Sequence, residues 1–423
     1  MYIDSNIRKK KRSNSKWLIF IFYMIFIFTI EPFFRQPLYD ISEQLILDIQ
    51  GSDPKNSFLI NCAELISHIG SNFLFVPILI IVYNYANIYK AYTLLLSLLI
   101  PIGGYSILKV IYVSPRPFFK NENIQIFGCE CGWGNPSGRS FNSMAFFLTL
   151  WKIMIDCKQI RDKKLVKFIF LIFTCLLVIL IMFSCIILGS SSINQVLFGG
   201  LLGLGVYFFL FYVLCIRPND HRQFSVILNF RNIIYFILNL IIFLFVFIIF
   251  KFNQINGDIQ SEFEKNISAK CPDTPENLRF HKEALVNFGI FLSNIGAFVG
   301  IKFDYFFSFR ENLENWYQFN FELSEPKDDS SLMTKITLNR ETQWNHTNIF
   351  YSILRLFLII VFSSVMMFPY FFFDWNDNIA LVFIFKLVLP TNMLAFCYFY
   401  LFKVLLKSLK MVNLSMYSLS ESI

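Results

Sequence analysis

Charged residues are scarce in this chain. Only 16% of its 423 residues are Asp, Glu, Lys or Arg, whereas 56% are hydrophobic. This composition excludes an ordinary soluble domain, and the apolar runs of about 20 residues are long enough to cross ~30 Å of hydrocarbon as helices. The sequence therefore predicts an all-α fold, a polytopic transmembrane helical bundle.

Histidine is also rare, with four residues in all, and none of the nine cysteines forms a Cys-x-x-Cys pair of zinc-binding spacing. We therefore expect no metal site and no cofactor. The net charge of +8 would favour nucleic acid in a soluble domain. Here the basic residues lie in short loops beside apolar runs, where they set membrane orientation, and no nucleic-acid partner is expected.

Apolar runs predict about ten membrane spans. They cover residues 17–34, 57–85, 90–112, 140–156, 165–188, 194–215, 229–252, 284–302, 346–373 and 378–406. The basic segment 1–16 precedes the first span, which is typical of a signal anchor with a cytosolic N-terminus. Alternation then puts the basic loop 152–167 and the tail 407–423 in the cytosol too, in agreement with the positive-inside rule.

The loops at the other ends of the spans are expected to face a lumen. Asn266 begins an Asn-Ile-Ser sequon there and is a candidate for glycosylation, whereas the sequons at Asn345 and Asn413 fall on the cytosolic side. Cys129 and Cys131 share one loop of this kind, and Cys271 lies in another. A disulfide between the two loops requires an oxidising compartment.

Three blocks of polar residues indicate an oxyanion site. They are Lys109-x6-Arg116-Pro117; Cys129-Glu130-x-Gly132-x-Gly134-x-Pro136-Ser137-Gly138-Arg139; and Ser184-Cys185-x5-Ser191-x3-Gln195. Lysine offers a point charge and arginine a planar fork to a phosphate, and a helix beginning at Ser137 and Gly138 can present backbone N–H groups to the same anion. Both pieces reach the same membrane face. The phosphate-binding candidates are Lys109, Arg116, Ser137, Gly138 and Arg139.

These blocks resemble the type 2 phosphatidate phosphatase superfamily, whose signatures read Lys-x6-Arg-Pro, Pro-Ser-Gly-His and Ser-Arg-x5-His-x3-Asp. The second block and Gln195 are most similar to the glucose-6-phosphatase branch. The resemblance covers residues 45–215 and implies a phosphatase-like membrane core, followed by further helices in 216–406. The span at 17–34 is then an extra N-terminal anchor.

The resemblance also implies that the catalytic residues have been replaced. In the superfamily one His attacks phosphorus, an Arg binds the phosphate, and a second His protonates the leaving alcohol; Ser191, Cys185 and Arg139 stand at those positions. A serine needs a neighbouring base, and arginine stays protonated. Of the four histidines, His221 and His346 fall on the cytosolic side, and neither His68 nor His281 has a spacing that ties it to the blocks. Arg139 and Ser191 are therefore degenerate positions, and no residue is assigned as catalytic.

Our leading interpretation is a catalytically degenerate, glucose-6-phosphatase-like membrane protein. It would bind a phosphate-bearing small molecule or membrane lipid, or serve as a structural subunit with membrane protein partners. The alternative is an active lumenal phosphomonoesterase. A transporter is a weaker alternative that rests on Lys386 inside the last span.

Plainer interpretations of the same residues also stay open. Lys109 and Arg116 could be interface cations, and the serines at 190–192 could simply start a helix. The resemblance implies an endoplasmic-reticulum or other endomembrane location. A mitochondrial inner membrane also stays open.

Overall fold

The structure is a computed structural model that describes residues 2–51, 58–85, 88–156, 160, 162–214, 232–256, 261–304, 306, 349–366, 374, 378–402 and 404–405. The predictions that concern His221, His346, the sequons at Asn345 and Asn413 and the tail 407–423 lie outside these residues. Most of the described residues are helical, and their only β-type pairing is an isolated bridge between Gly132 and Phe280.

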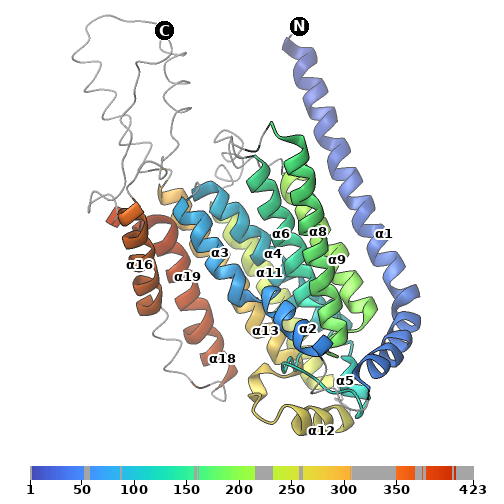
Figure 1. Ribbon diagram of the computed structural model, residues 1–423. Helices are drawn as coiled ribbons and strands as arrows, with labels where there is room; N and C mark the ends of the chain where they lie inside the picture. Colours follow the sequence, from blue (N-terminus) through green and yellow to red (C-terminus); the bar gives the residue numbers. More distant parts are fainter. Residues whose placement is uncertain are drawn as a thin grey trace, which may run out of the picture.

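The helices follow one another in a single bundle (Figure 1). The N-terminal part comprises α1 (Tyr2–Gln50), α2 (Phe58–Ile69), α3 (Asn72–Tyr85), α4 (Ile88–Tyr112), α5 (Pro117–Lys120), α6 (Gly138–Ile155), α8 (Lys164–Ile187), α9 (Ile193–Phe208) and η2 (Phe209–Val213). The C-terminal part comprises α11 (Asn232–Asn256), α12 (Ser261–Lys270), η3 (Glu276–Leu278), α13 (Phe280–Phe291), α16 (Ile349–Met366), α18 (Ile379–Leu381), η5 (Val382–Val388), α19 (Leu389–Phe396) and η6 (Cys397–Leu401).

Eight helical segments of the described chain are long and apolar enough to cross a bilayer, which confirms the predicted fold class and makes the chain a multi-pass membrane protein. They are Ser15–Gln50, Phe58–Tyr83, Lys90–Lys120, Lys164–Ile187, Ile193–Val213, Ile233–Gln254, Phe280–Asp304 and Ile379–Leu401. Two further spans were expected at 140–156 and 346–373, where α6 and α16 lie. Helix α6 packs against α4, α8 and α9, so its polar residues need not face lipid.

The boundaries of two spans differ from those expected. The first span is part of a helix that continues beyond residue 34 to Gln50, with Pro32 and Pro37 inside it. Proline removes a backbone donor and bends a helix, and α1 turns toward α5 at its C-terminal end (Figure 1). The segment expected as one span at 57–85 is interrupted at Gly70 and Ser71, between α2 and α3.

Glycines allow α9 to approach α6 closely. A Cβ atom on Gly199 would lie 2.6 Å from the Ser137 carbonyl oxygen, and one on Gly203 would lie 2.6 Å from that of Phe141. Any larger residue would force the helices apart. This contact fixes the start of α6 beside the start of α9, so the second and third sequence blocks meet.

Short helices and loops close the end of the bundle where the blocks lie (Figure 1). A disulfide joins Cys129, in the loop before α6, to Cys271 after α12, whereas Cys131 is a buried free thiol. Lys270 Nζ donates hydrogen bonds to the carbonyls of Phe118, Asn121 and Ile124 at 2.9–3.3 Å. The loops on this end are therefore tied to one another by covalent and polar contacts.

The glycosylation predicted at Asn266 conflicts with this packing. Asn266 is 3% exposed, and its Nδ2 atom donates a hydrogen bond of 2.8 Å to the Phe119 carbonyl. A glycan would be attached to that same nitrogen. The three residues of a sequon do not report tertiary packing. They could not indicate that the side of α12 that carries Asn266 packs against α5.

Candidate phosphate-binding cavity

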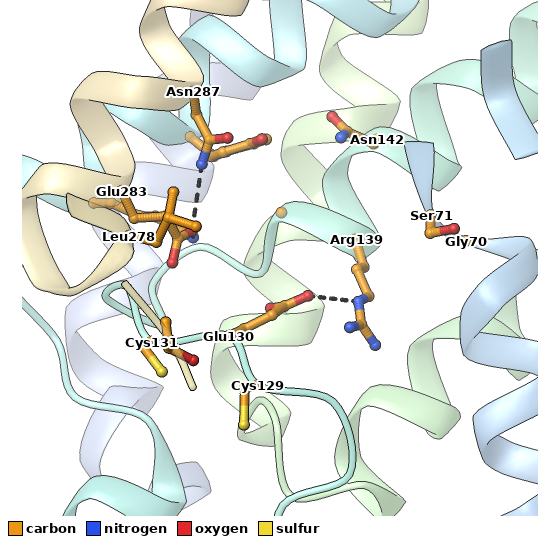
Figure 2. Close-up of a pocket in the computed structure, with 14 residues that line it drawn as sticks. Gly70, Ser71, Cys129, Glu130, Cys131, Arg139, Asn142, Leu278, Glu283 and Asn287 are labelled. Carbon is orange, nitrogen blue, oxygen red and sulfur yellow. Dashed lines mark hydrogen bonds and ion pairs between the residues drawn. The ribbon is translucent and has the colours of Figure 1, made fainter. Parts of the chain in front are cut away.

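A cavity of about 290 Å³ lies at this end of the bundle. Its walls come from the α2–α3 break, from α4, α6 and α13, and from the loops that carry the disulfide (Figure 2). The lining residues are Gly70, Ser71, Tyr105, Lys109, Cys129, Glu130, Cys131, Gly138, Arg139, Asn142, Thr274, Leu278, Glu283 and Asn287.

Lys109 forms an ion pair with Glu283 in the wall of the cavity. Its Nζ atom donates to Glu283 Oε1 at 2.9 Å and lies 5.1 Å from the Tyr105 ring centroid. Asn287, one turn along α13, donates to the same carboxylate oxygen at 3.3 Å. The Lys109 side chain is only 3% exposed, so pairing with Glu283 offsets the cost of burying the ammonium group.

Glu130 bridges two arginines in the second ion-pair group. Its carboxylate lies 2.9 Å from Arg116 Nη2 and 2.6 Å from Arg139 Nε. Burial by itself raises the pKa of the Glu130 carboxyl, but Arg139, Arg116 and Lys109 together lower the pKa to about 2. Glu130 is therefore ionised at neutral pH and occupies a place suited to an anion.

Only part of the predicted phosphate site lines the cavity. Lys109, Gly138 and Arg139 do, whereas Arg116 and Ser137 are 1% and 2% exposed and lie outside its lining. Arg116 donates to the Gly132 carbonyl at 2.7 Å and to the Ser190 carbonyl at 2.5 Å. Arg116 thus ties the second block to the third.

The Ser137 backbone amide is also committed to the fold. It donates to the Gln195 carbonyl at 3.0 Å, and the Gln195 side chain closes a capping box with Ser192 at the start of α9. The N–H groups of the first turn of α6 then begin at Gly138, which lines the cavity. The first turn of α6 therefore starts at the cavity wall.

The two other replaced positions lie close to this site without facing the cavity. Ser191 Oγ is 3.3 Å from Ser137 Oγ, and Ser191 is 1% exposed. Cys185 is fully buried beside the Arg139 guanidinium. Cys185 stands where the superfamily has an arginine. Arg139 therefore places a positive charge next to that position.

Neither described histidine reaches the cavity. His68 is exposed near the C-terminal end of α2, and buried His281 accepts a 3.0 Å hydrogen bond at Nδ1 from Trp133 Nε1. Of the residues that the structure describes, no group of three His, Cys, Asp or Glu side chains is arranged to hold a metal ion.

Sequence reasoning missed the contribution of α13. Glu283 and Asn287 lie 174 and 178 positions beyond Lys109, so no local spacing connects them to it. One signal was present, because Glu283 directly precedes the predicted span at 284–302 and a carboxylate at such a place indicates a partner. Asn142 and the Gly70–Ser71 break gave no comparable signal.

The first helix also supports the site. Buried Glu31 accepts hydrogen bonds from Asn135 Nδ2 at 2.7 Å and from Arg35 Nε at 2.8 Å. Asn135 precedes Pro136 through a cis peptide bond in the turn that leads into α6. The segment expected as an extra anchor therefore contacts the second block directly.

The fold and the cavity together define a polytopic α-helical membrane protein with a charged cavity at one end of its bundle. Residues 90–219 match the family model described as the PAP2 superfamily. The match supports this superfamily for the segment from α4 to η2, which holds all three sequence blocks. No curated protein and no solved structure matches the chain.

Proposed function

We propose that this chain is a catalytically degenerate, phosphatase-like membrane protein that binds a phosphate-bearing ligand without hydrolysing it. The observation that carries the proposal is the group formed by Arg139, Glu130 and Arg116. It places the Arg139 guanidinium, held by Glu130, at the position where the superfamily has the histidine that protonates the leaving alcohol.

The charges around the cavity favour an anion. Lys109, Arg116 and Arg139 contribute +3, and Glu130 and Glu283 contribute −2, so the group carries a net +1. Glu130 already occupies the space between Arg116 and Arg139 as an anion would. Charge-assisted bonds from Arg and Lys to phosphate oxygens are short and strong, and the first turn of α6 adds backbone donors.

The same residues argue against hydrolysis. The Arg139 guanidinium is held by Glu130 and Ser67 and cannot act as a general acid. Ser191 Oγ lies next to the hydroxyl of Ser137, which is not a base. Loss of a catalytic nucleophile lowers rates by on the order of 10⁴- to 10⁶-fold.

We also propose the finer assignment to a glucose-6-phosphatase-like type in an endoplasmic-reticulum-like membrane, with both termini in the cytosol. The Cys129–Cys271 disulfide supports a lumenal position for the cavity, because disulfides persist in oxidising compartments. Binding of a lipid headgroup or assembly with another membrane protein would use the same degenerate fold.

The test measures binding and turnover on the same purified full-length protein in detergent. We expect inorganic phosphate and vanadate to bind, and no phosphate to be released from glucose 6-phosphate or phosphatidate. Lys109→Ala should weaken vanadate binding about tenfold or more. Lys265→Ala is a matched control, because Lys265 is 76% exposed and pairs with Glu122 outside the cavity.

Release of phosphate that Ser191→Ala or Arg139→Ala abolishes would overturn the proposal in favour of an active phosphomonoesterase. Absence of phosphate and vanadate binding would also overturn it.

A further inference from the structure

Both cations that line the cavity are already paired with carboxylates that line it too. Lys109 lies 2.9 Å from Glu283, and Arg139 lies 2.6 Å from Glu130. A phosphate that takes Lys109 therefore leaves Glu283 without a cation, whereas Glu130 keeps Arg116 when a phosphate takes Arg139. A carboxylate left unpaired in a partly buried place is unfavourable unless another cation reaches it.

Asn142 provides a second, independent observation. It lines the cavity and is only 5% exposed, yet its Oδ1 atom has no hydrogen-bond partner in the described part of the chain. Figure 2 shows Asn142 on α6 across the cavity from Glu283 and Asn287 of α13. A buried carbonyl oxygen of this kind requires a donor. The atom is closed to solvent in the structure, so a ligand donates to it once the Asn142 amide turns toward the cavity.

We propose, on the basis of the function proposed above, that the cavity takes a small zwitterion, a phosphate ester that also carries an ammonium group. Its phosphate group binds Lys109 and Arg139. Its ammonium group binds the displaced carboxylate of Glu283 and donates to Asn142 Oδ1. Phosphoethanolamine is the simplest compound of this class.

The size of the cavity limits the ligand further. Ligand cavities usually measure about 300–1,000 Å³, so a volume of about 290 Å³ suits a headgroup or a short ester. A hydroxyl group in place of the ammonium would also satisfy Asn142 Oδ1. It would leave the displaced carboxylate without a cation, so a neutral sugar phosphate fits less well.

Three ligands of equal length separate these effects. Aminoethyl phosphate, hydroxyethyl phosphate and propyl phosphate differ only in the terminal ammonium, hydroxyl or methyl group. Titration calorimetry on the full-length protein, in a detergent without phosphate, should rank them in that order. We expect aminoethyl phosphate to bind about tenfold more tightly than propyl phosphate.

The same titrations on Glu283→Gln should abolish the preference for the amine over the hydroxyl compound, because the neutral amide cannot form an ion pair with an ammonium. Asn142→Ala should reduce the affinity for the amine and the hydroxyl compound but not for propyl phosphate. Glu276→Gln is the control, since Glu276 is 80% exposed and lies outside the cavity lining. It should leave the ranking unchanged.

The ranking on the unmodified protein decides the matter even if a variant does not fold. Equal affinities, or tighter binding of hydroxyethyl or propyl phosphate, would refute the zwitterion while the proposed function stands. If neither these ligands nor inorganic phosphate binds, the proposed function itself fails.

A competition experiment then separates a soluble ligand from a lipid headgroup. The protein is placed in nanodiscs that contain either phosphatidylethanolamine or phosphatidylglycerol. Weaker binding of aminoethyl phosphate only in the phosphatidylethanolamine discs identifies a lipid headgroup. Equal binding in both discs identifies the soluble ester.

Discussion

Two parts of the chain meet at the cavity and contribute opposite kinds of group. The segment that matches the PAP2 superfamily brings both lining cations, Lys109 and Arg139, together with Glu130. The segment around α13 brings the carboxylate of Glu283, the amide of Asn287 and no lining cation. The matched segment thus supplies the cations that can bind an anion. The other segment supplies Glu283, which competes with an anion for Lys109.

The two parts are also held by different kinds of contact. Within the matched segment, buried Arg116 donates hydrogen bonds to two backbone carbonyls and forms an ion pair with Glu130. The α12–α13 segment is joined to it by the Cys129–Cys271 disulfide and by the Lys109–Glu283 pair. The following substitutions separate these contributions.

The largest effect is expected for Arg116→Ala. It leaves the Gly132 and Ser190 carbonyls without their buried donor and removes one partner of Glu130. Breaking a buried ion pair in this way costs about 3–5 kcal/mol of the free energy of unfolding. Thermal unfolding in detergent should show the loss, and an unfolding temperature equal to that of Lys265→Ala would rule out this role of Arg116.

Removal of the disulfide should come next. Cys129→Ser is expected to lower the free energy of unfolding by about 2–5 kcal/mol, because the bond closes a loop with a sequence separation of 142 residues. Cys175→Ser is the control, since Cys175 is an exposed free thiol. A reductant should destabilise the unmodified protein but not Cys129→Ser; equal sensitivity of the two would contradict the prediction.

Glu130→Gln should have a moderate effect that depends on pH. The folded-state pKa of Glu130 is about 2, below the ordinary value of 4.5, so the ionised carboxylate stabilises the fold above pH 4.5. This contribution is lost as the pH falls from 4.5 toward 2. The variant should be less stable by about 1–2 kcal/mol at pH 7.

The difference between Glu130→Gln and the unmodified protein should shrink below pH 4.5. Unfolding temperatures measured at several pH values test this. A difference that stays constant from pH 7 down to the acid limit of the assay would show that the Glu130 charge does not contribute as described.

The smallest change in stability is expected for Gly132→Ala. An added Cβ would lie 2.1 Å from Glu283 Oε2, the far end of a flexible side chain. The carboxylate can move away, so we expect a loss below about 1 kcal/mol. Lys109 is then less fully paired, and inorganic phosphate should bind a few times more tightly. Weaker phosphate binding would show that Glu283 does not compete for Lys109.

The sequence predicted the class of fold because apolar runs report membrane crossing directly. The sequence also predicted that Lys109, Gly138 and Arg139 lie at the same end of the bundle, and all three line the cavity. The membrane depth of a residue and the start of a helix follow from local composition. These are the features that one sequence specifies well.

Long-range pairing could not be predicted in the same way. Glu130 was visible only as part of a motif, and the bridge that it forms depends on how the loop after α5 folds back over α6. The choice between Cys129 and Cys131 as the partner of Cys271 depends on which side chain that loop buries. The burial of Asn266 likewise depends on the packing of α12 against α5.

The most direct test of retained binding without hydrolysis uses aminoethyl phosphate labelled in its phosphate group. The purified full-length protein is incubated with the labelled ester, and bound, released and covalently attached label are measured together. We predict that intact ester is retained, with no free phosphate and no label that survives denaturation. Free phosphate, or a phosphorylated protein, would contradict the account.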